Sequence, residues 1–422
     1  MDFNSALMDI TPQESVEMGG FANRGGGSLG VHLPITCRGL ALREDARACC
    51  LLALDIMDMD AVVARELKQA ISGRTGVPAA HIHLHSTHTH SSIYWDTSPA
   101  NARWKAATRE RVIAMAERLL NGPFRPMRMS FGRAQHQLAK NRTAIPGAAN
   151  DPEVAFLSLE DLEGKNRVIL LNYACHPVVL GPENRLISPD FVGPAREAVE
   201  QAWGGMVLYT NGAGGNLNPK WCKQSDVKVA EHAGRELAAA VLAARLEACA
   251  PPLTLETLSG EVLLPLRQDV FSRESILAVA ERESRRPTEF NNWPGYVELW
   301  KNSMLARLEK GALSGKLPLE IAALRIGPAT LVFSQGEAFV EYQLALKRLH
   351  QGRPFLFVGY SNGIGGYIPT RESLAAPGYE ADLAYLYLKT PAPPAVEAAA
   401  VYQHALAALL GLKNGKPAVA VC

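Results

Sequence analysis

The sequence lacks the features that mark several large classes of protein. Its seven cysteines are an odd number and include no Cys-x-x-Cys pair, which argues against a disulfide framework and against a cysteine zinc site. The formal net charge is only +1, so the chain lacks the basic surface that nucleic-acid-binding proteins carry. No apolar run reaches the length of a membrane span, and the first residues lack the basic and apolar segments of a secretory signal. We therefore expect a cytoplasmic protein with no transmembrane segment and no nucleic-acid partner. We expect reduced thiols at Cys37, Cys49, Cys50, Cys175, Cys222, Cys249 and Cys422.

Nucleotide-binding fingerprints are also missing. The glycine-rich loop 211–220 reads Asn-Gly-Ala-Gly-Gly-Asn-Leu-Asn-Pro-Lys. Backbone amides in such a turn can approach an anion, but the Gly-Lys-Ser/Thr end of a Walker motif is absent. The glycine spacing of a dinucleotide-binding turn is not met either. The sequence therefore predicts a tight loop that exposes polar side chains.

The composition is that of a soluble globular protein, because 47% of the residues are hydrophobic and 20% are charged. Apolar strand patterns alternate with helical periodicity, and the run 48–56 is nearly all apolar, as expected of a strand covered on both faces. We predict an α/β fold in which mixed β-sheets pack with α-helices. The predicted strands are 48–56, 127–131, 155–159, 168–173, 206–210, 319–326, 329–333 and 354–360. The predicted helices are 60–71, 103–120, 195–203, 227–249, 380–388 and 394–411.

Glycine and proline residues interrupt this pattern of strands and helices. Gly73 is placed to stop the helix 60–71, and Pro251-Pro252 closes the helix 227–249 and is the best candidate for an internal boundary. The charged region 270–315 contains Pro287 and Pro294. We interpret this region as a helical excursion over the core that would act as a lid.

Five of the eleven histidines fall within residues 81–90. Histidine is the commonest metal ligand, because neutral imidazole offers a nitrogen lone pair. In an extended segment His81, His83 and His85 share one face, and His88 and His90 would leave the strand end on one side. The spacing is wrong for the helical His-Glu-x-x-His motif and suits a site at a strand end. The alternative is a surface histidine tract, since composition alone indicates metal only weakly.

Other candidate ligands also follow predicted strands. His176 comes directly before Pro177 and is either a ligand or a core histidine bonded to the backbone. Glu337 follows a glycine and precedes a helix, so it is either a ligand or compensates the helix dipole. Asp55 either supports the site or caps the following helix.

Two further residues stand out less. Arg142 lies in a predicted loop, where an arginine is usually a solvated charge. Tyr367 lies among glycines, which cannot cover it, so we expect its ring to be partly exposed.

Taken in order, these segments resemble the N-terminal catalytic domain of the neutral ceramidases. Each motif alone is weak, but their order agrees with the family from about residue 7 to about residue 390, which makes the set specific. The motifs are Gly19-Gly20-Phe21-Ala22-Asn23, Leu54-Asp55-Ile56, Thr87-His88-Thr89-His90-Ser91, Asn141-Arg142, His176-Pro177, Ser188-Pro189-Asp190, Gly336-Glu337-Ala338-Phe339 and Tyr367-Ile368-Pro369-Thr370.

The resemblance implies a domain, a metal and a reaction. It implies one large catalytic domain over residues 1–422, without the C-terminal immunoglobulin-like domain of the longer members. It also implies a zinc-dependent amidohydrolase that cleaves the amide of an N-acyl sphingoid base with metal-activated water. The implied zinc ligands are His88, His176, Glu337 and Tyr367. The implied catalytic residues are His90 for proton transfer and Arg142, Asn218 and Tyr379 for stabilising the oxyanion or orienting the substrate.

The sequence departs from the family in two places. Where the family has a serine in a Gly-Asp-Val-Ser-Pro-Asn loop, this chain has Asn218, which cannot attack a carbonyl. The glycine-rich continuation after the histidine motif is replaced by Ser92-Ile93-Tyr94-Trp95, which would reshape the mouth of the pocket. Because the sequence shows no secretion signal and no membrane segment, we expect a small soluble amide, ester or lactone rather than a ceramide in a bilayer.

Two other functions stay open. A non-hydrolytic lyase or isomerase of a sugar-like compound would keep the metal ligands and would not need the serine. A catalytically silent binding homologue would keep the ligands without an open position on the metal. The sequence leaves the oligomeric state and the metal open, since imidazole and oxygen ligands also accept other divalent ions.

Overall fold

The computed structural model of the chain describes residues 1–267, 271–288, 292–350, 352–376 and 378–412. Six of the seven cysteines are free thiols, which agrees with the expected reduced state, and Cys422 lies outside the described residues. None of the helices in these ranges combines the length and the apolar character that a membrane span requires.

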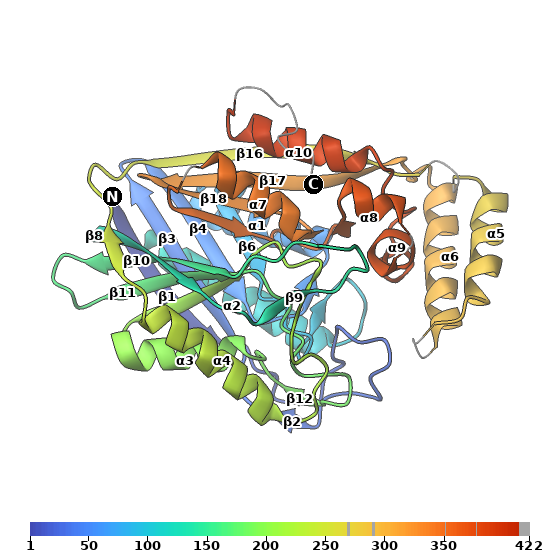
Figure 1. Cartoon of the computed structure of the whole chain (residues 1–422), viewed down its shortest axis with the longest axis horizontal. Coiled ribbons are helices and arrows are strands. Elements are labelled where there is room, and N and C mark those ends of the chain that lie inside the picture. Colours follow the sequence, from blue (N-terminus) through green and yellow to red (C-terminus); the bar gives the residue numbers. More distant parts are fainter. Residues whose placement is uncertain (268–270, 289–291, 351, 377, 413–422) are drawn as a thin grey trace.

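A mixed nine-stranded sheet forms the larger part of the core (Figure 1). The two strand pairs at its ends are parallel and the others are antiparallel. In spatial order the strands are β13 (Met206–Asn211), β11 (Arg167–Tyr173), β10 (Glu153–Asp161), β8 (Arg125–Gln135), β1 (Asp2–Asp9), β3 (Thr36–Glu44), β4 (Arg47–Leu54) and β6 (Ile82–Ser86), and β15 (Leu246–Ala248) pairs with β8.

A second sheet packs face to face on the first. Leu40 and Phe131 of the large sheet share one apolar cluster with Leu324 and Phe333 of the second, so strands of the large sheet are covered on both faces, as predicted for the run 48–56. The strands of the second sheet are β16 (Leu255–Pro265), β17 (Lys316–Ile326), β18 (Ala329–Ser334) and β20 (Phe355–Val358).

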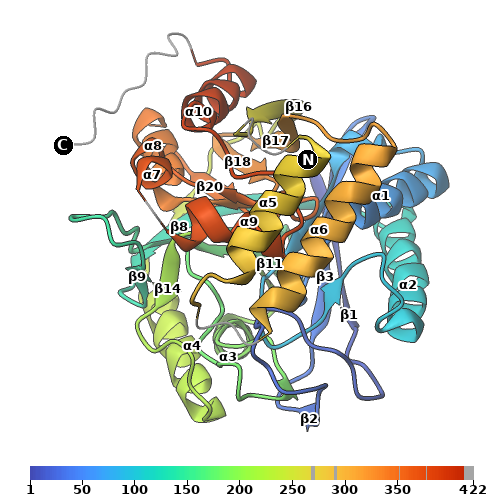
Figure 2. The same ribbon diagram turned by 90° about the vertical axis from the view of Figure 1, so that its right-hand side faces the viewer.

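Helices cover both outer faces, so the molecule has four layers (Figures 1 and 2). On the large sheet lie α1 (Ala61–Thr75), α2 (Ala102–Asn121), α3 (Val192–Trp203) and α4 (Val227–Leu242). On the second sheet lie α7 (Val340–Leu349) and α10 (Ala398–Leu409). This arrangement confirms the predicted α/β class with mixed sheets packed with helices.

The helical excursion predicted for 270–315 is confirmed in its described residues. It contains α5 (Arg273–Ser284) and α6 (Trp293–Glu309), which lie side by side at one end of the molecule (Figures 1 and 2). The remaining short helices are α8 (Arg371–Ala375) and α9 (Ala384–Tyr387). The short strand pairs are β2 (Gly30–Val31) with β12 (Leu186–Ile187), β5 (Asp58–Met59) with β7 (Tyr94–Trp95), β9 (Ala139–Asn141) with β14 (Leu217–Pro219), and β19 (Glu337–Ala338) with β21 (Tyr367–Ile368).

Several predicted boundaries are wrong, and local or tertiary contacts explain them. Helix α1 runs through Gly73 and ends where Gly76 adopts a left-handed conformation, with φ of 74°. The helix predicted for 227–249 ends at residue 242, because the chain then pairs with β8 as β15. The helix predicted for 380–388 begins as a π-helical turn at Tyr379–Leu383. Pro251-Pro252, which we predicted as the best candidate for an internal boundary, lies in the segment that joins the large sheet to the second sheet.

Two glycines in differently packed places, one in the large sheet and one in a helix, test the packing of the structure. A β-carbon on Gly132 of β8 would lie 2.2 Å from the phenyl Cζ of Phe156, so Gly132→Ala should lower the free energy of unfolding by about 1–3 kcal/mol, the usual cost of overpacking. A β-carbon on Gly73 of α1 would meet no atom within 4 Å, so Gly73→Ala should raise that free energy by about 0.5–1 kcal/mol through helix propensity. Urea denaturation measures both variants, and a shift of the same sign and size for both would contradict this packing.

Candidate metal centre

Segments that follow strands of both sheets meet at one point in the molecule. The loop after β6 carries His88 and His90, and the segment after β11 carries His176. Strands β19 and β21 pair in parallel with Glu337 opposite Tyr367, so the backbone register sets these two side chains next to each other. Loops beyond the ends of parallel strands commonly form such sites, because they emerge on one side of the sheet.

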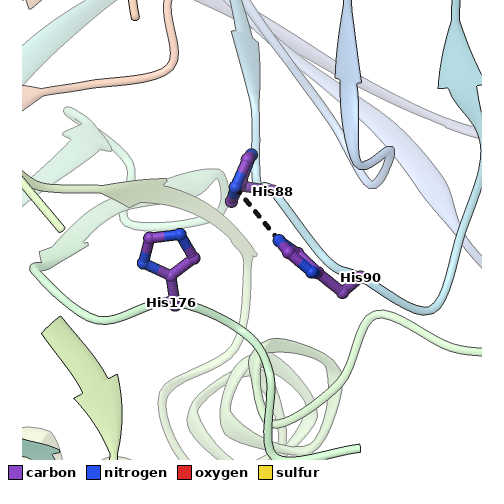
Figure 3. Close-up of side chains that lie close together, drawn as sticks. All are labelled: His88, His90 and His176. Carbon is purple, nitrogen blue, oxygen red and sulfur yellow. Dashed lines mark hydrogen bonds between the residues drawn. The ribbon is translucent and has the colours of Figure 1, made fainter. Parts of the chain in front are cut away.

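The imidazoles of His88, His90 and His176 form a triad in which His88 and His176 are buried and His90 is partly buried (Figure 3). One nitrogen from each ring lies within 4.8 Å of the others, and the Nε2 atoms of His88 and His90 are 3.2 Å apart. His88 has a φ of 68°, a left-handed conformation that is uncommon outside glycine and is concentrated at functional sites. This triad could hold a metal ion, because imidazole nitrogen is a common ligand.

His176 is oriented by the backbone around it. Its Nδ1 donates to the carbonyl oxygen of Gly214 at 2.7 Å, and since a carbonyl can only accept, the proton lies on Nδ1. The lone pair of Nε2 then faces the carboxylate of Glu337 at 3.0 Å. The backbone hydrogen bond expected of a core histidine therefore presents the other nitrogen to the centre, as is usual for histidine ligands.

Glu337 brings a carboxylate into contact with two of the imidazoles. Its Oε2 lies 3.0 Å from Nε2 of His176 and 3.6 Å from Nε2 of His88. Burial raises the pKa of this carboxyl group, although His88, Arg142 and a hydrogen bond with Tyr367 act in the opposite direction. The carboxylate faces these imidazoles, and the following helix α7 has no side-chain cap at its start.

Arg142 links this centre to the surrounding loops. Its Nη2 donates to the hydroxyl of Tyr367 at 3.1 Å and to the carbonyl oxygen of Gly215 at 2.8 Å. Its Nη1 donates to Oδ1 of Asn218 at 3.0 Å, and its Nε donates to Glu380 at 2.8 Å. Arg142 is therefore not the solvated loop charge that the local pattern suggested.

Asn218, Tyr367 and Tyr379 surround this guanidinium. Because arginine can only donate, its contact fixes Oδ1 of Asn218 as the acceptor and leaves the Nδ2 group as a donor. The ring of Tyr367 lies 5.8 Å from the ring of Tyr379, and burial raises the pKa of both phenols, which keeps them protonated in the absence of a metal. The expectation that Tyr367 is partly exposed is wrong, since only 7% of it is accessible.

The three imidazoles are neutral in this environment. Burial is the main cause that lowers the pKa of His88, His90 and His176. Neighbouring imidazoles and Arg142 lower the pKa of His90 and His176 further. The neutral form is the one that binds metal.

The first three histidines of the tract do not reach this centre. His83 and His85 share one face of β6, as expected, with Ile82 and Leu84 on the other face, but His81 lies in the turn before the strand. His81 precedes β6, and its Nε2 contacts the hydroxyl of Thr257. The ring of His83 stacks on Phe333 with the centroids 4.0 Å apart. His85 is bonded through both ring nitrogens to backbone groups of residues 359 and 211.

Asp55 does not cap the following helix, because other groups bind its carboxylate. Its two oxygens accept from Arg196 at 2.8 and 2.7 Å, and they also accept from the hydroxyls of Thr36 and Thr87. Helix α1 instead begins after Asp60. The other interpretation fits, because Asp55 anchors the residue directly before His88.

Three residues contact the histidines in ways that the sequence did not predict, although Gly20 belongs to one of the motifs named above. The ring of Tyr360 lies 4.2 Å from that of His88, but its position after an apolar strand resembles an ordinary core tyrosine. A β-carbon on Gly20 would lie 2.5 Å from the His90 ring, and the Gly-Gly pair in the sequence was the available signal. Nη2 of Arg24 donates to the carbonyl oxygen of His90 at 2.6 Å, and no motif marks this arginine.

A cavity of about 1910 Å³ approaches the centre at Phe21, although its lining among the described residues includes none of the three histidines, Glu337 or Tyr367. Residues of the 15–27 loop, of α1 and of α6 line it, so the predicted helical excursion forms one of its walls. Phe21 also lines it, and the ring of Phe21 contacts the ring of His90 with the centroids 5.0 Å apart. We call this cavity the groove.

The donor set fits a divalent metal ion. Neutral imidazole nitrogens, one buried carboxylate and one phenol converge, and two Nε2 atoms face each other at 3.2 Å. Histidine nitrogen and carboxylate oxygen are the usual ligands of catalytic zinc. Other divalent ions accept the same donors, so the geometry does not select the metal.

Comparison with solved structures identifies the fold. The neutral ceramidase from Pseudomonas aeruginosa matches with a TM-score of 0.72 and 19% sequence identity, over 97% of this chain and 73% of that chain. A ceramidase complexed with C2 matches with a TM-score of 0.68 and 17% identity, over 96% of this chain and 73% of that one. No family model and no curated protein sequence matches the chain. The resemblance inferred from the motifs is thus confirmed at the level of the fold, which is neutral-ceramidase-like.

Proposed function

We propose that this protein is a metal-dependent hydrolase that cleaves the amide bond of a small soluble molecule by the attack of water. The observation that carries the proposal is the convergence of His88, His176, Glu337 and Tyr367 from distant parts of the chain. The likeness to two ceramidase structures supports it. Esters and lactones are eligible substrates for the same chemistry.

These four residues are the proposed metal ligands, and zinc is the proposed metal. The resemblance to the neutral ceramidases implies this set and assigns His90, the third imidazole of the triad, to proton transfer. A bound zinc ion supplies a Lewis acid that polarises a carbonyl group and lowers the pKa of a water molecule. Asn218 stands where the neutral ceramidases have a serine, and a carboxamide is not a nucleophile. Water is therefore the nucleophile in this proposal.

His90 is the proposed proton-transfer residue. Its Nε2 lies 3.2 Å from Nε2 of His88, so a proton on this ring is close to a nitrogen of the proposed metal site. Burial and the imidazoles of His88 and His176 lower its pKa, which keeps it in the neutral form that accepts a proton from water. It then returns that proton to the leaving amine.

Asn218 and Tyr379 are the proposed donors to the oxygen that gains negative charge. The Nδ2 group of Asn218 is oriented by the bond from Arg142 to its Oδ1, and donors held in place before the reaction stabilise such an oxygen best. Arg142 itself uses four of its five N–H groups on Glu380, Asn218, Gly215 and Tyr367. We therefore assign Arg142 a positioning role.

The groove supports a polar substrate. Charged residues from several elements line it, among them Arg24, Asp60 and Lys68. Asp60 and Lys68 already have the partners Tyr94 and Glu320. A sphingoid base with a long acyl chain would, however, leave Arg24 without a partner, and polar groups removed from water without a partner are costly. A water-soluble amide matches this lining better.

Turnover in water enriched in oxygen-18 tests the reaction class. The zinc-loaded protein should hydrolyse at least one member of a panel of soluble amides, esters and lactones, and the released carboxylate should carry one labelled oxygen from the solvent. Turnover of sugar-like compounds without incorporation of label would instead identify a lyase or an isomerase. A metal-loaded protein that turns over only ceramide would refute the soluble substrate.

A further inference from the structure

Arg24 is a cation without a counter-ion at the wall of the groove. Among the described residues no carboxylate pairs with it, and the titratable side chain that acts on it is the phenol of Tyr387, which burial keeps protonated and neutral. Burial lowers the pKa of its guanidinium to about 10, so the group remains charged at neutral pH. A desolvated charge without a partner is costly and is retained where it has a function.

The hydrogen bonds of Arg24 leave part of its donor capacity free. Its Nε donates to the carbonyl oxygen of Asn184 at 3.1 Å, its Nη1 to that of Gly19 at 2.6 Å and its Nη2 to that of His90 at 2.6 Å. A guanidinium carries five N–H groups, so one N–H remains on each terminal nitrogen. The three carbonyl contacts hold the group rigidly, and rigid guanidinium groups suit carboxylates and phosphates.

The acidic residues that line the groove are engaged elsewhere or exposed. Asp60 accepts from the hydroxyl of Tyr94, and Glu320 pairs with Lys68. Asp96 pairs with Lys105, which lies outside the lining. The other two acidic lining residues, Glu17 and Glu261, are exposed. Among the described residues, none of these five carboxylates forms an ion pair with Arg24.

The position of Arg24 relates this charge to one half of the substrate. Its guanidinium carbon lies 5.2 Å from the centroid of the Phe21 ring, and that ring lies 5.0 Å from the ring of His90. In the proposed function His90 donates a proton to the leaving amine. A group bound by Arg24 therefore belongs to the amine half of the molecule.

We infer that the substrate carries a carboxylate on its amine half, as an N-acyl amino acid does, and that Arg24 binds this carboxylate. The inference rests on the proposed function, because it uses the role of His90 to decide which half of the amide faces Arg24. Arg24 is then a residue that determines substrate specificity. The amine half of a ceramide carries only neutral hydroxyls and offers no anion to this guanidinium.

Binding measurements test the inference without requiring turnover. Calorimetric titration of the full zinc-loaded chain uses N-hexanoylglycine, its uncharged methyl ester and N-hexanoylphosphoethanolamine as probes. The wild type should bind N-hexanoylglycine about 10- to 150-fold more tightly than the ester, the range expected for hydrogen bonds to a charged group. Arg24→Gln should remove this preference and leave binding of the ester unchanged, and Arg24→Lys should retain part of it.

A matched control separates a binding role from a structural one. Arg74→Gln removes an exposed guanidinium of α1 that pairs with Glu110 and Glu117 and should leave the preference intact. Equal binding of acid and ester by the wild type, or an equal loss of both in Arg24→Gln, would overturn the inference. An Arg24-dependent preference for the phosphate probe over N-hexanoylglycine would overturn the carboxylate assignment.

The two proposals fail separately. If no solvent oxygen enters any product while the Arg24-dependent preference for the acid persists, the hydrolase proposal falls and the anion site stands. If the label enters a neutral amide product but acid and ester bind equally, the hydrolase proposal stands and the role of Arg24 falls.

Discussion

Replacing Glu337 by glutamine is expected to lower the affinity for zinc by more than about 100-fold, because even residues that only orient metal ligands typically contribute 10- to 100-fold. The amide keeps the shape of the side chain and removes the charge that faces His88 and His176. Turnover at limiting zinc should fall in proportion. Isothermal titration of the metal-free protein with zinc measures the affinity.

His81→Ala is the matched control for this prediction. His81 belongs to the same histidine tract, but it contacts Thr257 and lies outside the triad. Its replacement should leave both the zinc affinity and the turnover unchanged. An equal loss of zinc affinity in His81→Ala and Glu337→Gln would mean that the histidine tract binds the metal nonspecifically and that the centre formed by His88, His176, Glu337 and Tyr367 does not bind it.

The buried pair between Asp55 and Arg196 should account for the largest loss of stability. Asp55→Asn leaves the guanidinium of Arg196 buried without an opposite charge, and breaking a buried pair in this way costs about 3–5 kcal/mol. The side chains of Asp55 and Arg196 are 0% and 3% accessible. Glu110→Gln removes an exposed partner of Arg74 and should cost about 0–1 kcal/mol.

The same pair predicts a dependence of stability on pH. Burial alone would raise the pKa of Asp55, but Arg196, Arg38 and Thr36 together lower it below its ordinary value. A carboxyl group with a lower pKa in the folded state binds a proton more readily when unfolded. Its stabilisation is therefore present above the unfolded pKa of about 3.9 and is lost as the pH falls below it. Urea denaturation between pH 3 and 7 measures the free energy of unfolding of the wild type and of Asp55→Asn. The same dependence of this free energy on pH in both proteins would contradict the role of the pair.

The strands of the core could be predicted from the sequence because burial on both faces leaves a continuous apolar run. The run 48–56 became β4, and the runs near 168 and 206 became β11 and β13. Element ends were less predictable, since they depend on pairing with distant segments. Residues after 242 form a strand only because β8 offers an open edge to them.

The residues of the candidate site could be predicted because they recur in the order of a known family. The structure brings His88, His176, Glu337 and Tyr367 together, and their role as ligands stays a prediction. Arg24 was not predictable, because its partners are backbone carbonyls of residues 19, 90 and 184. Such contacts leave no pattern in the local sequence and exist only once the fold has formed.

Anomalous X-ray diffraction at the zinc edge, from crystals of protein purified without added metal, would locate the metal among the four proposed ligands. We predict one strong peak among Nε2 of His88, Nε2 of His176, the carboxylate of Glu337 and the hydroxyl of Tyr367. A peak elsewhere in the molecule, or no peak at this point after soaking in zinc, would contradict this prediction.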